Sequence, residues 1–324
     1  MISDCENSTK DEGLTKPESL WVNAYIQDVV TGIGLIGNIL ICVVLMKKSV
    51  RSTFNQLRVA LALFDIVMLI TMFLTNALFR SSKDILQLVY PVFLWPLKSF
   101  AMTISVFMTV AMAWERYGAV HYPYTYKSYE ECRAVKYVMS LTVAALLLNA
   151  GKYFELKPTE CIEQRGFRGI FKLGPILRNR IYALYYNLIF FKIVIAGIIP
   201  ITLLIYLYAK IFLRIREQKQ HVVSQNARAK DKLVKEHRMA VTFAGVVVTS
   251  LVCTIPGLLL VILVVEDGGD LRDLGCYETI FLVRDILFTL NSAVNIFIYS
   301  CLDNTFRREL KKFLRNLIRK PTNY

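Results

Sequence analysis

Seven long apolar stretches, separated by polar segments, make up most of this 324-residue chain. A helix needs ~20 apolar residues to cross the hydrocarbon core of a bilayer, and each stretch is close to that length or longer. In lipid the backbone has to find its hydrogen-bond partners within its own segment, so each stretch is predicted to be an α-helix. The predicted spans cover approximately residues 22–46, 55–79, 90–118, 134–151, 182–213, 239–265 and 277–301.

The third stretch carries its less apolar residues in a regular pattern. Between Lys98 and Arg116 they recur at steps of three and four, which places them on one stripe of a helix. At ~1.5 Å rise per residue the two cations stand roughly 27 Å apart, so this helix is expected to reach both sides of a membrane. The small and sulfur-bearing members also suit a simple packing role. The stripe consists of Lys98, Met102, Ser105, Thr109, Met112 and Arg116.

Composition indicates a membrane protein. Hydrophobic residues make up 55% of the chain, charged residues make up 20%, and the mean hydropathy is +0.44, which is too apolar for a soluble protein of this length. The net charge of +14 is interpreted as a topology signal and as attraction to anionic lipids, and nucleic acid is not an expected partner. The sequence has three scattered histidines and no arrangement of a nucleophile with a base. We therefore expect neither an enzyme nor an organic cofactor.

Lysine and arginine residues are concentrated after the first, third and fifth spans and in the tail. By the positive-inside rule these segments are cytoplasmic. The sequon at Asn7 predicts glycosylation of an extracellular N-terminal segment, which lacks the pattern of a cleavable signal peptide. The predicted organisation in the plasma membrane is an extracellular segment (1–21), a membrane bundle (22–301), and an amphipathic helix with a short tail on the inner leaflet (302–324).

Three of the seven cysteines, Cys5, Cys161 and Cys276, are predicted to lie outside the cell, where disulfides persist. The other four fall in the spans or on the cytoplasmic side. Three thiols allow at most one intramolecular bridge, and their spacing leaves the identity of the pair open.

Several spans contain groups that need partners inside the bundle. Asp65 is a lone carboxylate near the middle of the second span, so it has to be neutral, paired or bound to an ion. Asn291, Asn295 and Tyr299 lie near one face of the seventh span and require hydrogen bonds. Gly37, which precedes an asparagine in the first span, indicates a close contact between helices.

Taken in order, these residues resemble the rhodopsin-like (class A) family of G-protein-coupled receptors over nearly the whole chain. Within that family, the end of the fourth span, the Tyr90-Pro91 opening of the third and the missing outer cysteine are most similar to invertebrate FMRFamide-type neuropeptide receptors. Thr254 and Ile296 depart from the family pattern, in which a tryptophan and a proline occupy these positions. The matching residues are Gly37-Asn38, Leu61, Asp65, Glu115-Arg116-Tyr117, Pro200, Tyr208, Pro256, Asn295, Tyr299 and the stretch 306–310.

The resemblance implies a two-state switch that an extracellular ligand drives and that activates a heterotrimeric G protein. Arg116 would pair with Glu115 and Glu236 in the inactive state and would turn toward Tyr208 in the active state. Alternatively, Glu236 is solvated. The tail has few hydroxyl groups, which implies weak recruitment of arrestin. The implied switch residues are Glu115, Arg116, Tyr117, Tyr208, Glu236, Asn295 and Tyr299.

An allosteric sodium ion is a further implication of the resemblance. Hard cations prefer oxygen ligands, and a bound ion would favour the inactive state by neutralising a buried carboxylate. The implied pocket consists of Asp65, Ser105, Asn291 and Asn295, with Asp65 and Ser105 as the metal ligands.

Lys98 stands where amine receptors of this family carry an aspartate, so a monoamine ligand is rejected. Lys98 can form a structural salt bridge with Asp285. Otherwise the surplus positive charge predicts a ligand with acidic groups, whereas acidic residues of the outer loops could receive the arginine of an RF-amide peptide. The predicted ligand contacts are Asn76, Lys98, Met102, Tyr186, Lys192, Arg284 and Asp285, and the acidic residues are Glu160, Glu163, Asp267, Asp270 and Glu278.

The leading hypothesis is therefore a G-protein-coupled receptor for an extracellular neuropeptide of the FMRFamide-like type. One alternative is a divergent receptor for a small or acidic ligand with reduced or lost G-protein coupling, which the departures at Thr254 and Ile296 keep open. A membrane transporter is an alternative of another class, although the sequence shows no repeated halves.

Overall fold

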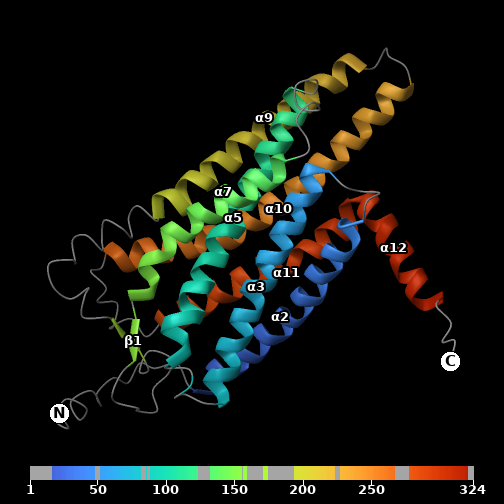
Figure 1. The fold of residues 1–324 in the computed structure, drawn as a ribbon. Coiled ribbons are helices and arrows are strands. Elements are labelled where there is room, and N and C mark those ends of the chain that lie inside the picture. Colours follow the sequence, from blue (N-terminus) through green and yellow to red (C-terminus); the bar gives the residue numbers. More distant parts are fainter. Residues whose placement is uncertain are drawn as a thin grey trace, which may run out of the picture.

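The computed structural model describes residues 17–47, 52–81, 85, 88–122, 132–154, 156–158, 171–173, 193–222, 227–266 and 277–319. In this part of the chain, long helices lie side by side in one bundle, and one further helix leaves the bundle at an angle (Figure 1). The long helices are α2 (Pro17–Leu45), α3 (Thr53–Ser81), α5 (Trp95–His121), α7 (Arg133–Asn149), α9 (Ile199–Val222), α10 (Ala227–Glu266) and α11 (Tyr277–Leu302), and the departing helix is α12 (Asn304–Arg319).

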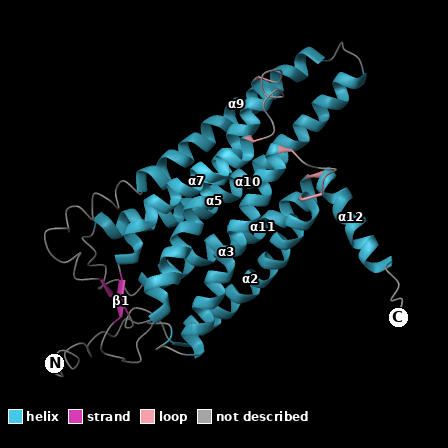
Figure 2. Ribbon diagram, viewed as in Figure 1, coloured by secondary structure: helices cyan, strands magenta, loops and turns pink. Residues whose placement is uncertain are grey.

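Short segments extend three of these helices. A π-helical turn, η2 (Tyr90–Leu94), leads into α5, and another, η6 (Val194–Ile198), leads into α9. A 3-10 turn, η3 (Ala150–Phe154), follows α7. The strands β1 (Leu156–Pro158) and β2 (Phe171–Leu173) pair antiparallel, with Lys157 opposite Lys172. This small hairpin, shown in magenta in Figure 2, is the one departure of the described fold from the predicted all-α architecture.

The predicted seven-helix membrane architecture is confirmed. Six helices of the described chain are long and apolar enough to cross a membrane, and α10 adds the shorter apolar segment Ala240–Pro256. The sequence analysis places predicted spans at 182–213 and 239–265, with a polar stretch between them. The structure extends α9 to Val222 and begins α10 at Ala227, so both helices continue well beyond their apolar segments.

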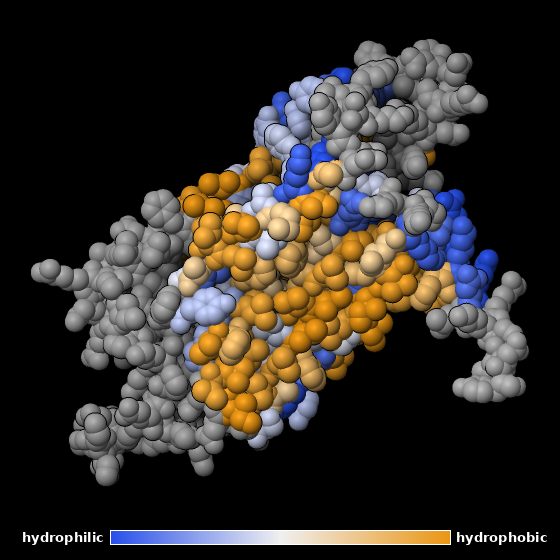
Figure 3. All heavy atoms as spheres, viewed as in Figure 1, coloured by the Kyte–Doolittle hydropathy of each residue, from blue (hydrophilic) through white to orange (hydrophobic). Residues whose placement is uncertain are grey.

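The surface of the bundle is apolar over its middle, as expected for helices that face lipid (Figure 3). Figure 3 shows a broad band of hydrophobic side chains over the middle of the bundle and hydrophilic residues toward α12. Large apolar side chains such as Val29, Ile36 and Leu147 are exposed. In water this much exposed apolar surface would be unfavourable, whereas in a bilayer it faces acyl chains.

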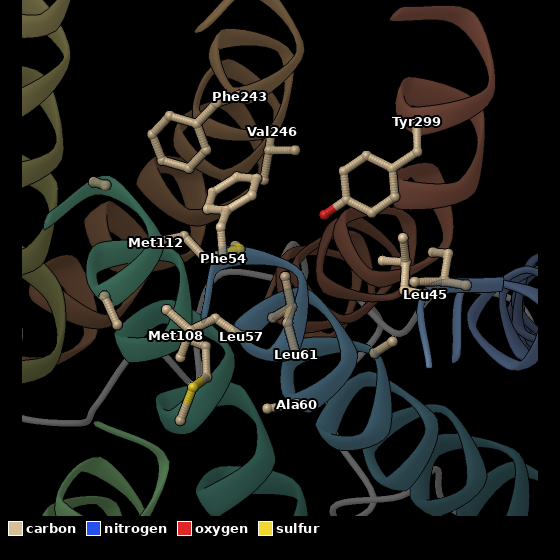
Figure 4. Close-up of a cluster of buried hydrophobic side chains, with 14 of the residues drawn as sticks. Leu45, Phe54, Leu57, Ala60, Leu61, Met108, Met112, Phe243, Val246 and Tyr299 are labelled. Atoms are coloured by element: carbon tan, nitrogen blue, oxygen red, sulfur yellow. The ribbon is translucent and has the colours of Figure 1, made fainter. Parts of the chain in front are cut away.

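The helix α5 occupies the centre of the bundle. Its membrane segment is 67% buried within the protein, compared with 17% for that of α7, which is peripheral. Its apolar residues form one hydrophobic core with those of α2, α3, α9, α10 and α11, part of which is shown in Figure 4. The central helix is therefore also the one that carries the stripe from Lys98 to Arg116.

The helices α2 and α11 approach closely because glycines form part of the contact. An added Cβ at Gly37 would lie 2.6 Å from Cγ2 and 2.9 Å from Cβ of Ile296, and one at Gly34 would lie 3.0 Å from Cβ of Ala293. Asn38 then donates a hydrogen bond across the interface to the carbonyl oxygen of Ser292, at 3.0 Å. This is the close helix contact that the sequence predicts.

Replacing Gly37 with alanine is expected to destabilise the bundle by ~1–3 kcal/mol, because the added methyl group overlaps a β-branched side chain that cannot rotate away. Thermal unfolding of the purified protein in detergent would measure the loss. Gly32→Ala is the matched control in the same helix, since nothing lies within 4 Å of its added Cβ. Equal stability of the two variants would contradict the close packing of α2 on α11.

Candidate functional site

Asp65 joins three helices in the middle of the bundle. Its carboxylate is fully buried and accepts hydrogen bonds from Ser105 on α5 at 3.1 Å and from Ser292 and Asn295 on α11 at 3.0 and 2.8 Å. A buried carboxylate is tolerated only when such donors replace its hydration. The structure thus brings together three of the four residues of the implied sodium pocket.

The fourth residue, Asn291, has another partner: its side-chain oxygen accepts a hydrogen bond from Ser250 on α10, at 3.2 Å. Ser292, which the sequence analysis did not name, contacts Asp65 instead. Ser292 and Asn295 are three residues apart and so share a helical face, a spacing that could have identified the serine. The oxygens of Asp65, Ser105 and Ser292 are ligands that suit a hard cation such as sodium.

Arg116 lies inside the bundle at the end from which α12 departs. Its guanidinium carbon is 3.5 Å from the centre of the Phe54 ring on α3, a close cation–π contact. Its neighbour Glu115 is buried and forms an ion pair with Arg133 of α7, at 3.8 Å, a partner that the sequence analysis did not name. The arginine of the implied switch is therefore held within the protein rather than in lipid.

The other implied switch residues lie near this end. The Tyr117 ring stacks on the His121 ring at a centroid distance of 4.1 Å, and Tyr208 is partly buried on α9. Tyr299 is buried on α11. The side chain of Glu236 lies outside the described residues, so the implied pair with Arg116 stays a prediction.

Sequence reasoning missed Arg58, a buried cation on α3. Its side chain is 3% exposed and forms a salt bridge with Asp303 at 2.8 Å, and its guanidinium carbon is 3.7 Å from the centre of the Tyr299 ring. Asp303 also accepts hydrogen bonds from the backbone N–H groups of Thr305 and Phe306, which begin α12. The carboxylate thereby caps one helix while it pairs with another. The sequence contained a signal for this residue, because Arg58 is a single cation within a predicted apolar span.

Arg58, Arg116 and Tyr299 line a cavity of about 530 Å³ at the α12 end of the bundle. Figure 4 shows the hydroxyl group of Tyr299 directed from α11 toward Phe54 and Val246, which also line the cavity. The described residues that line it are Leu45, Ser52, Phe54, Asn55, Arg58, Met112, Arg116, Thr242, Phe243, Val246, Tyr299, Asp303, Thr305, Phe306, Arg308, Glu309 and Lys312.

Three predicted ligand contacts meet at the opposite end of the bundle. The Lys98 ammonium group is 2.6 Å from one oxygen of Asp285, and the other oxygen accepts hydrogen bonds from Arg284 at 3.0 and 3.2 Å. Lys98 is 3% exposed. The sequence left open whether Lys98 pairs with Asp285 or meets the ligand, and the structure shows the salt bridge with Asp285. Because Arg284 also pairs with Asp285, these three residues together carry one surplus positive charge.

Two other predicted contacts have structural partners. Asn76 donates hydrogen bonds to Gln27 and Asp28 on α2, at 3.3 and 3.1 Å, and Met102 packs with Met68, Met72 and Phe288. The remaining residues lie outside the described part of the chain, where the sequence predictions stand untested. They are Tyr186 and Lys192, the glycosylation site Asn7, the cysteines Cys5, Cys161 and Cys276, and the acidic residues Glu160, Glu163, Asp267 and Asp270. Glu278 belongs to α11, but its side chain is not described, so its predicted role is also untested.

A comparison with protein-family models decides the class of this bundle. The model described as 7 transmembrane receptor (rhodopsin family) matches residues 37–299, which include Asp65, Arg116 and the Lys98–Asp285 pair. The chain belongs to the rhodopsin family of seven-transmembrane receptors. This assignment confirms the resemblance seen in the motifs and replaces the transporter alternative.

Two curated relatives have low sequence identity to the receptor, but each aligns with most of its length. An FMRFamide receptor of Drosophila melanogaster is 25% identical over 309 residues, which cover 89% of this chain and 53% of the relative. A probable G-protein coupled receptor of Caenorhabditis elegans is 24% identical over 310 residues, which cover 89% of this chain and 68% of the relative. The receptor thus spans about half the length of the Drosophila protein.

Removing one member of the Lys98–Asp285 pair is expected to destabilise the receptor strongly. Lys98→Met should cost ~3 kcal/mol, at the low end for a broken buried ion pair because Arg284 still accompanies Asp285. Asp285→Asn should cost more, since it leaves two cations without their carboxylate. Unfolding of the single and double variants would give the coupling energy.

The exposed pair of Arg214 and Glu217, at 3.1 Å, provides the control. Arg214→Met should change the free energy of unfolding by less than ~1 kcal/mol. Strictly additive losses for Lys98→Met and Asp285→Asn would mean that their contact contributes nothing to stability.

Proposed function

We propose that this receptor responds to an extracellular peptide of the FMRFamide type and activates a heterotrimeric G protein. The observation that carries the peptide assignment is the similarity to the Drosophila FMRFamide receptor over 89% of this chain. The replacement of the amine-binding carboxylate by Lys98 supports it further, because an ammonium ligand would meet a cation there.

In this proposal the Lys98 end of the bundle is extracellular and the α12 end is cytoplasmic. The basic residues that follow the first and third spans and those of α12 support this orientation. The extracellular N-terminal segment would carry a glycan at Asn7, and the basic face of α12 would lie on anionic lipid of the plasma membrane.

The central helix would connect the two ends. A ligand near Lys98 would contact the start of α5, and Arg116 lines the cavity at its other end. Outward movement of α10 would enlarge that cavity for a segment of the G protein, with Arg116 turning from Phe54 toward Tyr208. A ligand produces this shift only if it binds the open state more tightly than the closed one.

A screen of RF-amide peptides on membranes that contain the receptor and a promiscuous G protein would test the proposal. At least one peptide should raise the rate of nucleotide exchange at least tenfold, and Arg116→Ala should return the rate to its basal value. Lys136→Gln, an exposed cation on α7, serves as the control and should leave the response unchanged. If peptides bind but exchange never rises, the receptor has lost G-protein coupling.

A second proposal concerns sodium at Asp65. The ion would replace the hydrogen bonds that Asp65 now accepts and would favour the inactive packing of α3, α5 and α11. Replacing choline with sodium in the buffer should therefore lower agonist affinity several-fold, and Asp65→Asn or Ser292→Ala should reduce that response. An agonist affinity that is identical in both salts would exclude a functional sodium site.

The surplus positive charge around Asp285 favours one other ligand class, in which an acidic group approaches Lys98 and Arg284. Acidic peptides and small carboxylic acids belong in the same screen. A response to these compounds and not to RF-amides would assign the receptor to that class.

A further inference from the structure

Among the described residues, the lining of the cavity at the α12 end carries more cations than carboxylates. These residues include four cationic side chains, Arg58, Arg116, Arg308 and Lys312, and two carboxylates, Asp303 and Glu309. Both carboxylates are engaged: Asp303 with Arg58, and Glu309 with Lys312 at 2.9 Å. The hydrogen bond from Lys312 lowers the pKa of Glu309, so the acid is ionised in this balance. A concave site with surplus charge of one sign attracts ions of the other sign.

Three buried polar atoms in the wall of this cavity make no hydrogen bond of normal geometry with a described residue, although the side chains of Arg58 and Tyr299 lie close enough to interact with each other. Two are nitrogens of Arg58, Nε and Nη2, and the third is the hydroxyl oxygen of Tyr299. Arg58 Nη1 has its partners in Asp303 at 2.8 Å and Asn55 at 3.2 Å. Buried polar groups in proteins are nearly always hydrogen-bonded, so three in one cavity wall that lack a normal hydrogen bond require an explanation.

A purely structural role explains only part of this arrangement. The salt bridge to Asp303 holds α3 against the junction of α11 and α12, and the guanidinium covers the ring of Tyr299. Neither contact gives Nε or Nη2 of Arg58 a hydrogen bond of normal geometry. A ligand with several acceptor oxygens would satisfy them and the tyrosine hydroxyl together, and a guanidinium binds such oxyanions through paired N–H groups.

We propose that this cavity binds an anion that carries more than one phosphate group, with Arg58 and Tyr299 as its deep contacts. Arg308 and Lys312, which are 69% and 58% exposed, provide the second charged region at the rim. A volume of about 530 Å³ lies within the range of small-molecule sites, ~300–1,000 Å³, and exceeds what a single small ion needs. The phosphates can belong to a soluble metabolite or to a lipid headgroup.

Binding at this site does not rest on the proposed G-protein coupling. Because Arg116 lines the same cavity, however, a bound polyphosphate would occupy the space into which a G protein is proposed to insert. It would also hold Tyr299 and α3 in their present positions. The anion would therefore act as a negative regulator wherever coupling is present.

The test uses the purified full chain without a G protein. Inositol trisphosphate is titrated onto the protein in detergent, and nanodiscs of phosphatidylcholine with and without phosphatidylinositol bisphosphate supply the lipid arm. Binding should be saturable. Arg58→Leu should weaken it at least tenfold and Lys312→Gln about threefold, while the exposed control Lys136→Gln should leave it unchanged. If Arg58→Leu fails to fold, the proposal is tested by Lys312→Gln and by Tyr299→Phe, which removes only the hydroxyl group. Both variants should weaken binding.

If the trisphosphate binds saturably and these variants weaken its binding, the ligand is a soluble anion. If binding is seen only in the bisphosphate nanodiscs and the same variants weaken it, the ligand is a lipid headgroup. Absence of binding in both arms would overturn the proposal. So would equal effects of Lys312→Gln and Lys136→Gln, or binding of the tricarboxylate citrate with the same affinity as the trisphosphate. Each result is independent of whether any peptide activates the receptor.

Discussion

The carboxylate of Asp65 is the interaction on which the arrangement of the bundle depends most. It is fully buried among three helices, and every hydrogen bond that it accepts from Ser105, Ser292 and Asn295 crosses a helix interface. In a hydrocarbon environment no water is available to replace a lost donor. The relative rotation of α3, α5 and α11 is therefore fixed, because turning any one of them by a residue would leave the acid without part of its shell.

Charge pairing divides the molecule into two differently organised ends. Near Lys98 the charges are close together and share Asp285, so that end is held by direct salt bridges. At the α12 end the cations Arg58 and Arg116 are covered instead by the faces of Tyr299 and Phe54. Aromatic faces hold a guanidinium without consuming its hydrogen bonds. At the α12 end this leaves two nitrogens of Arg58 without a hydrogen bond of normal geometry.

Much of this organisation could be predicted from the sequence because membrane burial makes polar residues conspicuous. Asp65, Arg116 and Gly37 stood out within apolar runs, and the structure places each of them at a helix contact. The partners were harder to predict. Asn291 was predicted beside Asp65, whereas in the structure the adjacent Ser292 donates to Asp65 and Asn291 accepts from Ser250. A one-residue step turns a helix by ~100°, so neighbouring positions face different partners. Arg133 pairs with an acid on another helix, and Arg58 pairs with an acid at the junction of α11 and α12. Sequence spacing carries no information about such contacts.

The length of α10 has a mechanical consequence. The helix runs without interruption for 40 residues, so it is ~60 Å long, about twice the thickness of the hydrocarbon core. Pro256 lies near one end, and the part from Ala227 to this proline measures ~44 Å. Proline removes one backbone hydrogen bond and makes this the natural pivot. A tilt of ~10° there would carry the distant tip through ~8 Å, so in the proposed mechanism the helix would act as a lever, with a small rearrangement among buried side chains producing a displacement the size of a side chain or more.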